Sequence, residues 1–184
     1  TFHINMPDYA YLYAIPYSYN EKYGMRRYGF HGTSHYYVAN RAAEIIGKPI
    51  EQLNIITCHL GNGCSIAAVR GGISVDTSMG FTPLEGLVMG TRCGDIDPGL
   101  ILTIIDRENF SIEEANTFFN KQCGMKGLSG LSSDMREIEN AAAAGHQRAR
   151  QALDIFCYRV KKYISAYIGV LNGADLIVFT GGIG

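Results

Sequence analysis

Arg92 lies in a segment whose residue types suit the binding of an anion. Residues 74–98 read SVDTSMGFTPLEGLVMGTRCGDIDP and keep neither the helical nor the strand period of apolar residues. The guanidinium of Arg92 offers a planar fork of donors that matches phosphate oxygens. Asp95 and Asp97 are either ordinary ion-pair partners of this group or groups that orient it. The segment also holds glycines that permit tight turns and close approach to a ligand, namely Gly80, Gly86, Gly90 and Gly94. We therefore expect an anionic substrate.

Two histidines, His31 and His35, are spaced at i and i+4 in the motif FHGTSH, across the predicted start of a helix. Metal ligands use this spacing, but no third ligand is evident and the acid of an HExxH motif is absent, so packed or capping histidines are an equal alternative. A third interpretation is that His31 meets an anion where the unpaired backbone donors of the helix start point.

The motif HLGNG, residues 59–63, lies between two predicted strands. A hairpin turn with Asn62 and Gly63 at positive φ is its ordinary interpretation. A glycine turn also presents successive backbone N–H groups to a phosphate, and His59 adds a donor at its edge. The turn and a phosphate site can be the same loop.

Two further polar stretches have an ordinary and a functional interpretation. Asp134 and Arg136, in SSDMRE, suit the first turn of a solvated helix. The apolar run LIVF leads into Gly181 and Gly182, and a strand followed by a glycine turn is typical of phosphate and nucleotide sites.

The elements that position these groups follow from periodicity, caps and turns. Short glycine turns predict antiparallel strands over 53–60, 64–69 and 72–75, and a further strand is predicted over 175–180. Helices are predicted over 33–46, 99–107, 111–122, 132–144 and 145–171, with caps at Thr33 or Ser34 and at Ser132 or Ser133, and a capping box formed by Ser111 and Glu114. We expect irregular structure over 9–28, a short strand over 27–30 and a loop over 124–130. The longest helix should turn inward Leu153, Phe156, Val160, Ile164 and Ile168.

Composition narrows the class of protein. The 184 residues are 47% hydrophobic with a net charge of −1 and no run of Lys or Arg, which argues against nucleic acid or an anionic membrane as partner. The five cysteines form no CxxC pair, so we expect neither a disulfide framework nor a zinc site, and a reducing cytoplasm fits best. The chain starts at Thr1 and stops within TGGIG. We therefore expect one α/β unit that is a fragment, truncated at both ends.

The chain resembles the acetate kinase family in five motifs that occur in the family's order, namely FHGTSH, HLGNG, residues 74–98, SSDMRE and VFTGGIG. The resemblance covers essentially the whole chain. It implies an α/β fold of the actin, heat-shock cognate and sugar kinase type, with a ribonuclease-H-like mixed sheet flanked by helices, of which residues 1–184 would be an incomplete part, mostly the C-terminal catalytic domain. It also implies a homodimer that transfers a phosphoryl group reversibly between ATP and acetate with Mg²⁺, giving acetyl phosphate and ADP.

The resemblance also implies roles for individual residues. His31 and Arg92 would stabilise the transferring phosphoryl group, and Phe30 and Pro83 would line the pocket for the acetate methyl group. The nucleotide and its phosphates would contact His59, Gly61, Asn62, Gly63, Asp134, Met135, Arg136, Gly181, Gly182 and Ile183.

The chain departs from the family pattern in a few places. The family's catalytic aspartate precedes the residues that match Phe2 and His3, so it and the magnesium ligands would lie outside this chain, and an isolated fragment would be inactive. Met135 stands where many relatives have an aromatic residue, and Cys93 replaces a common serine. Three alternatives stay open: a propionate or other short-chain carboxylate kinase, a pyrophosphate-linked relative, and a non-catalytic nucleotide-binding module of the same fold.

Overall fold

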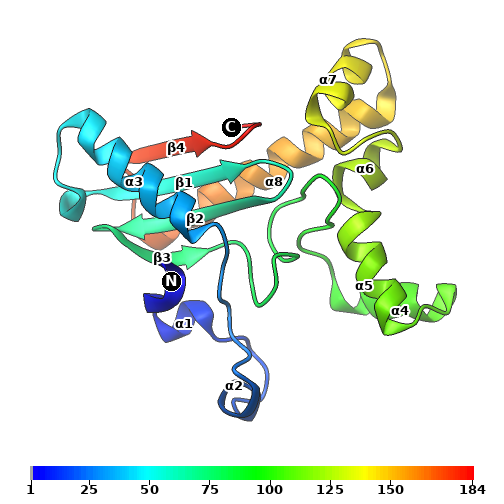
Figure 1. Cartoon of the computed structure of the whole chain (residues 1–184), viewed down its shortest axis with the longest axis horizontal. Coiled ribbons are helices and arrows are strands. Elements are labelled where there is room, and N and C mark those ends of the chain that lie inside the picture. The colour runs from blue at the N-terminus through cyan, green and yellow to red at the C-terminus, as the bar shows by residue number, and fades with distance from the viewer. Residues whose placement is uncertain (1) are drawn as a thin grey trace.

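A four-stranded mixed sheet forms the centre of the molecule (Figure 1). The computed structural model describes residues 2–184. The expected truncation at the N-terminus was predicted at Thr1, which lies outside the described residues. The strands are β1 (Asn54–Leu60), β2 (Cys64–Arg70), β3 (Ile73–Thr77) and β4 (Leu176–Thr180), in the order β3-β2-β1-β4. β1 pairs antiparallel with β2 and parallel with β4, and β2 pairs antiparallel with β3. The four predicted strands and their antiparallel hairpins are confirmed, and the expected α/β class with them.

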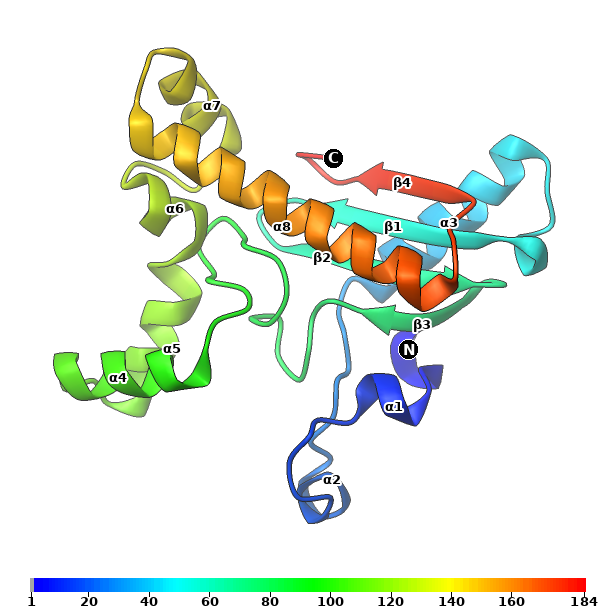
Figure 2. The same cartoon turned by 180° about the vertical axis from the view of Figure 1, so that it is seen from behind.

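One helix covers each face of the sheet. α3 (Gly32–Ile46) packs on β1 and β4 from one side, and the long α8 (Gln147–Leu171) packs on β2 and β1 from the other, as the two opposite views show (Figures 1 and 2). Residues 64–69 of β2 are all buried, because a strand covered on both faces has no solvent side. This arrangement brings the start of α3 to the same end of the sheet as the turn between β1 and β2.

The remaining helices surround this core. They are η1 (Phe2–Asn5), α1 (Asp8–Tyr11), α2 (Ser18–Tyr23), η2 (Ile50–Gln52), α4 (Pro98–Glu108), α5 (Ile112–Lys121), α6 (Gly124–Ser129) and α7 (Met135–Ala143). The predicted capping box of Ser111 and Glu114 opens α5. The helix predicted over 99–107 is α4, and Asp97 caps it by accepting a hydrogen bond from the backbone N–H of Leu100.

Several local predictions were wrong. Residues 9–28 include α1 and α2, and 124–130 include α6. No strand forms over 27–30, because Gly29 has a φ of 69° and the backbone N–H groups of Tyr28 and Gly29 both donate to the Gly80 carbonyl. The predicted serine cap of α7 is replaced by Asp134, whose side chain accepts from the backbone N–H of Arg136. α3 begins directly after His31, ahead of the threonine and serine expected to cap it.

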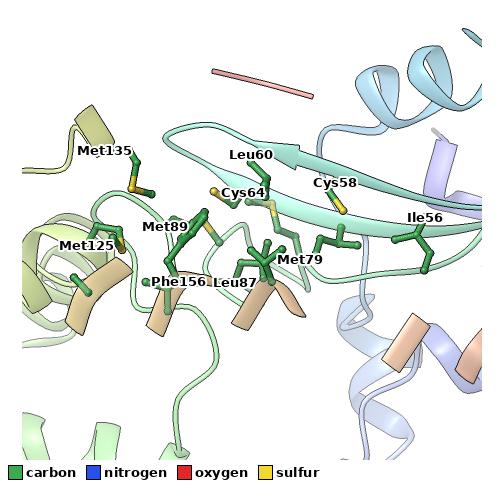
Figure 3. Close-up of a cluster of buried hydrophobic side chains, with 14 of the residues drawn as sticks. Ile56, Cys58, Leu60, Cys64, Met79, Leu87, Met89, Met125, Met135 and Phe156 are labelled. Atoms are coloured by element: carbon green, nitrogen blue, oxygen red, sulfur yellow. The ribbon is translucent and has the colours of Figure 1, made fainter. Parts of the chain in front are cut away.

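The main core is rich in sulfur and lies between the sheet, the loop after β3, and α8. Figure 3 shows Met89, Met125 and Phe156 close together on the α8 side of the sheet. On the predicted inner face of α8, Phe156 and Val160 are buried, whereas Ile168 is 41% exposed, since the buried face near the end of the helix runs through Tyr167 and Leu171 instead. All five cysteines are free thiols. No helix among residues 2–184 is both long and apolar enough to cross a membrane.

Candidate active site

His31 stands at the start of α3 with its backbone in the left-handed region, at φ 57°. A non-glycine residue seldom adopts this conformation, and such residues concentrate at functional sites. Its Nδ1 lies 2.9 Å from Ser65 Oγ on β2, and its ring stacks on His59 with centroids 4.1 Å apart. The opposite ring nitrogen, Nε2, faces the turn between β1 and β2.

His35, four residues later, is completely buried. Its Nδ1 lies 2.7 Å from Thr57 Oγ1 and its Nε2 lies 2.7 Å from Ser65 Oγ, so both ring nitrogens have partners within the protein. Of the alternatives open from the sequence, the packed histidine therefore describes His35. Within residues 2–184, no group of three or more His, Cys, Asp or Glu side chains could hold a metal ion.

Arg92 reaches the turn between β1 and β2 from the opposite side. A Cβ atom placed on Gly63 would lie 3.3 Å from Arg92 Nη1 and 3.5 Å from His31 Nε2. Two cationic or donor groups from distant parts of the sequence thus converge on one glycine, which has no side chain to separate them. Arg92 Nη1 also lies 3.4 Å from the Pro83 carbonyl oxygen.

The expected link between Arg92 and the two aspartates was wrong. Asp95 accepts hydrogen bonds from the Gly86 backbone N–H and from the Tyr163 hydroxyl, at 2.8 and 2.6 Å. Asp97 is engaged as the cap of α4. Both carboxylates therefore hold the loop and its following helix, and they leave the guanidinium free to face the turn.

The short helix α6 holds the backbone around Arg92. N–H groups at its start donate to three successive carbonyls of the loop: Cys123 to Thr91, Met125 to Met89 and Lys126 to Gly90, at 2.9–3.1 Å. The loop in turn donates from the Gly90 N–H to the Asn62 carbonyl, at 3.1 Å. This support was not predicted, because 124–130 contains three glycines, which argue against a helix.

A second support, also missed, holds the first part of the loop. Glu85 accepts from Arg27 at 2.6 Å and from the Tyr13 hydroxyl, while Arg27 also donates to the carbonyls of 77–79. The Phe81 N–H donates to the Tyr13 hydroxyl. The segment 9–28 is thus partly structural, and no local pattern could pair it with Glu85, which lies 58 positions after Arg27 and 72 after Tyr13.

The turn 61–63 is tight, with the Gly61 N–H donating to the Gly63 carbonyl at 3.2 Å. The hairpin prediction is confirmed, but neither Asn62 nor Gly63 has a positive φ. His59, at the end of β1, places its Nδ1 2.8 Å from Ser34 Oγ at the start of α3. The turn is therefore tied to α3 on one side and to the Arg92 loop on the other.

Residues expected to contact the nucleotide share a cavity of about 510 Å³ beside this turn. Its lining is Gly61, Asn62, Ser133, Asp134, Met135, Arg136, Gly182 and Ile183. Three segments remote in sequence meet here: the β1–β2 turn, the start of α7 and the chain after β4. Of the other expected contacts, His59 and Gly63 lie on the side of His31 and Arg92, and Gly181 packs on the Leu60 carbonyl.

Of the two residues expected in the acyl pocket, Phe30 packs partly buried against the main core, next to His31. Its carbonyl oxygen lies 3.0 Å from Nε2 of the buried His3. Pro83 meets Arg92 through its carbonyl oxygen. Pro83 is therefore in contact with Arg92, whereas Phe30 is next to His31 in the chain and is held by His3.

Burial keeps the imidazoles of this region neutral. Desolvation lowers the pKa of His31 to about 4, helped by the nearby charges of His59, Arg92 and His3. The same cause lowers the pKa of His35 well below its usual value, and that of His59 to a lesser degree. At neutral pH, His31 therefore has one N–H, and the main positive charge next to the turn is that of Arg92.

At the rim of the cavity, Asp134 and Arg136 form an exposed ion pair at 2.6 Å. The hydrogen bond from the guanidinium lowers the pKa of the Asp134 carboxyl to about 2. This pair places a charged donor and an acceptor at the mouth of the cavity, where a ligand could replace their mutual contact.

Comparison with known proteins identifies the relatives of this chain. It is 63% identical over 183 residues to the acetate kinase of Halothermothrix orenii, and 60% identical to that of Methanosarcina thermophila. Both matches cover 100% of this chain. The chain spans about 46% and 45% of those relatives' lengths.

Solved structures of similar fold belong to acetate and propionate kinases. The acetate kinase of Porphyromonas gingivalis superposes with a TM-score of 0.97 at 49% identity, over 99% of this chain and 46% of that one. A propionate kinase from Francisella tularensis superposes at 0.95 with 50% identity, over 100% and 47% of the two chains. The model of the acetokinase family matches residues 1–184, and the chain belongs to this family.

Proposed function

We propose that this chain carries the phosphoryl-holding half of an acetate kinase site, for reversible transfer between ATP and acetate. The observation that supports this most is the convergence of Arg92 and His31 on Gly63, beside the cavity that gathers the residues expected to contact the nucleotide. A site that only held a nucleotide would not need two further donors beyond the phosphates.

In the proposed step, a carboxylate oxygen of acetate attacks the γ-phosphorus of ATP in line with the leaving group. The new P–O bond forms as the bond from phosphorus to the bridging oxygen breaks, and ADP leaves with that oxygen. Negative charge spreads over the three equatorial oxygens in the transition state. The guanidinium of Arg92 and the Nε2–H of His31 would hold these oxygens, and the N–H groups of the turn 61–63 would hold the neighbouring phosphates.

The two ends of the reactants are assigned to opposite sides of the turn. The adenosine end would occupy the cavity lined by Asp134, Met135 and Arg136 and by the chain after β4. The acetate would lie on the other side, with its methyl group between Phe30 and Pro83. This assignment is supported by the position of the turn 61–63, which lies between the cavity residues and the group formed by His31, Arg92 and Pro83.

The proposal includes further properties implied by the family resemblance. These are a requirement for Mg²⁺, a homodimer and a cytoplasmic location, with residues 1–184 belonging mostly to the C-terminal catalytic domain. The resemblance puts the Mg²⁺ ligands outside residues 1–184, and no residue of this chain is assigned to the metal.

The proposal is tested in the full-length protein by trapping acetyl phosphate as the hydroxamate. Arg92→Ala and His31→Ala should each lower turnover by roughly 10²–10³, the usual effect of removing a donor that stabilises developing charge. Arg41→Ala is the matched control, since this side chain lies on α3 but forms only an exposed ion pair with Glu44. Wild-type turnover in either site variant would remove the proposed role.

A propionate kinase is the second candidate, because the propionate kinase structure matches the chain nearly as well as the acetate kinase structure does. The two substrates differ by one methylene group, which a pocket typically distinguishes by about 10–200-fold. The ratio of kcat/KM for acetate and propionate decides between them, and a ratio in favour of propionate would replace the first assignment.

A further inference from the structure

A chain of three hydrogen bonds leads from the sheet to His31. Thr57 Oγ1 on β1 lies 2.7 Å from His35 Nδ1, and His35 Nε2 lies 2.7 Å from Ser65 Oγ on β2. Ser65 Oγ then lies 2.9 Å from His31 Nδ1. The first three of these residues are completely buried, so water does not take part in the chain.

The direction of the hydrogens in this chain follows from counting them. Each hydroxyl supplies one hydrogen, and each neutral imidazole supplies one from one of its two nitrogens. If Thr57 donates to His35 Nδ1, then His35 Nε2–H donates to Ser65, and the Ser65 hydroxyl donates to His31 Nδ1. Every link then contains one hydrogen, and the hydrogen of His31 must be on Nε2.

The opposite direction leaves a buried donor without a partner. His31 Nδ1–H would donate to Ser65, Ser65 to His35 Nε2, and His35 Nδ1–H to Thr57. The Thr57 hydroxyl hydrogen would then need another acceptor, but within residues 2–184 its oxygen has no hydrogen-bond partner besides His35. Buried polar groups are almost always paired, and an unpaired one is strongly unfavourable.

A positively charged His35 does not change this result. It would donate from both nitrogens and so would still leave the Thr57 hydrogen unpaired, and burial strongly disfavours the charge. A charged His31 would require Nδ1–H, which would force the Ser65 hydrogen away from its present acceptor. The neutral, forward arrangement alone satisfies every member.

We propose that Thr57, His35 and Ser65 are positioning residues that lock His31 as its Nε2–H tautomer and so aim an N–H donor at the turn 61–63. This inference rests on the proposed function only for the identity of the acceptor, a phosphoryl oxygen. The other tautomer would present a lone pair at Nε2, which would repel that oxygen.

The tautomer can be read without any assay of activity. Two-bond ¹H–¹⁵N spectra of the full-length protein, labelled with ¹⁵N-histidine, distinguish Nδ1–H from Nε2–H in each ring. We expect Nε2–H for His31 in the wild type. Thr57→Val keeps the shape but removes the first hydrogen, and should give a mixture of tautomers or Nδ1–H at His31. Thr57→Ser retains a hydroxyl and should restore Nε2–H.

Kinetics then link the tautomer to the reaction. We expect Thr57→Val to lower kcat by roughly tenfold to a hundredfold, the effect found for outer groups that orient metal-binding imidazoles, with KM for ATP little changed. Thr57→Ser should recover most of this loss. Ser65→Ala breaks the chain at its last link and provides the same readout if Thr57→Val fails to fold.

The inference is overturned if His31 in the wild type carries its hydrogen on Nδ1, or if Thr57→Val and Ser65→Ala leave its tautomer unchanged. A different outcome would overturn the proposed function instead. If His31 has Nε2–H in the wild type and loses it in Thr57→Val, but the full-length protein transfers no phosphoryl group to any carboxylate, the positioning role stands and the proposed function does not. The two failures are therefore distinguishable.

Discussion

Gly63 is the residue at which the two halves of the site meet, and its missing side chain is required there. A Cβ atom would lie 3.3 Å from Arg92 Nη1 and 3.5 Å from His31 Nε2, in the space assigned to the phosphoryl group. We expect Gly63→Ala to lower kcat by about tenfold or more, because displacements on the order of 1 Å in positioned groups reduce rates strongly. The measurement is steady-state kinetics of hydroxamate formation.

Two further variants separate this effect from a general effect of replacing glycine. Gly169→Ala, on α8, meets no atom within 4 Å and should leave kinetics unchanged. In the double variant with Arg92→Ala, the effects should be less than additive, because there is then no guanidinium for the added methyl group to displace. Full additivity would show that Gly63 acts apart from Arg92.

The lowered pKa values of His31 and His35 predict a loss of stability in mild acid. The unfolded chain binds protons near the usual pKa of 6.5, whereas folded His31 does so only near 4. The unfolded state therefore holds more protons between these values, and the stability contributed by the neutral rings is complete above about 6.5 and declines as the pH falls toward about 4.

The thermal midpoint of the full-length protein between about pH 7 and pH 5 measures this decline. His35→Gln should have a lower midpoint at neutral pH but a shallower fall, because one buried imidazole no longer resists protonation. The titratable groups that act on His35 are the imidazoles of His3, His31 and His59, so carboxylates do not account for the difference between the two proteins. Parallel curves would contradict the prediction.

At the scale of elements, the docking of α6 on the Arg92 loop is the contact on which the site depends most. Gly124 has a φ of 63°, and a Cβ atom there would overlap the carbonyl oxygen of Met89 and approach the Arg92 backbone N to 2.8 Å. Gly124→Ala should therefore destabilise the fold by about 1–3 kcal/mol and reduce kcat, because the loop must shift.

A second glycine variant separates the clash from the backbone strain. Gly145 also has a positive φ, 93°, but its Cβ would meet no atom within 4 Å. Gly145→Ala thus carries the backbone strain without the clash, and should lower stability while leaving kcat near the wild-type value. If both variants reduce kcat equally, backbone strain alone explains the effect and the docking contact is not required.

The success of sequence reasoning differed between elements for physical reasons. The hairpins of β1, β2 and β3 were predictable because their turns are short and local, and the box at Ser111 is a signal of adjacent residues. α6 was not predictable, since its sequence GMKGLS has low helix propensity. The N–H groups at its start are paired with carbonyls of residues 89–91, far earlier in the chain. The start of α3 was misplaced because a histidine in the left-handed region has no recognisable cap signal.

The same distinction holds for the site. Arg92 and His31 were each predicted from their residue types as donors to an anion, but only the resemblance to a known family assigned both to one phosphoryl group. The sequence gives no signal that Ser65 joins two histidines, or that Asp95 bonds to Tyr163 across 68 positions. Such pairs depend on how the sheet and α8 pack, which local patterns do not specify.

At the scale of the whole molecule, β4 is an edge strand with one uncovered face. Leu176 and Val178 pack on the α3 side, whereas Ile177 and Phe179 are 43% and 53% exposed on the other. That face lies beside an apolar cavity of about 580 Å³ lined by α8 residues such as Phe156, Val160 and Ile164. An exposed apolar edge strand favours association between chains.

We therefore expect the 184-residue chain, prepared alone, to self-associate in a concentration-dependent way in sedimentation velocity. Phe179→Lys should shift the distribution toward monomer, because a charge on the strand face disfavours its burial against another copy. Ile45→Lys is the matched control: Ile45 is 70% exposed on α3, away from this face, and its replacement should leave association unchanged. A chain that stays monomeric at every concentration, with its helical circular dichroism intact, would show that the edge and cavity do not drive association.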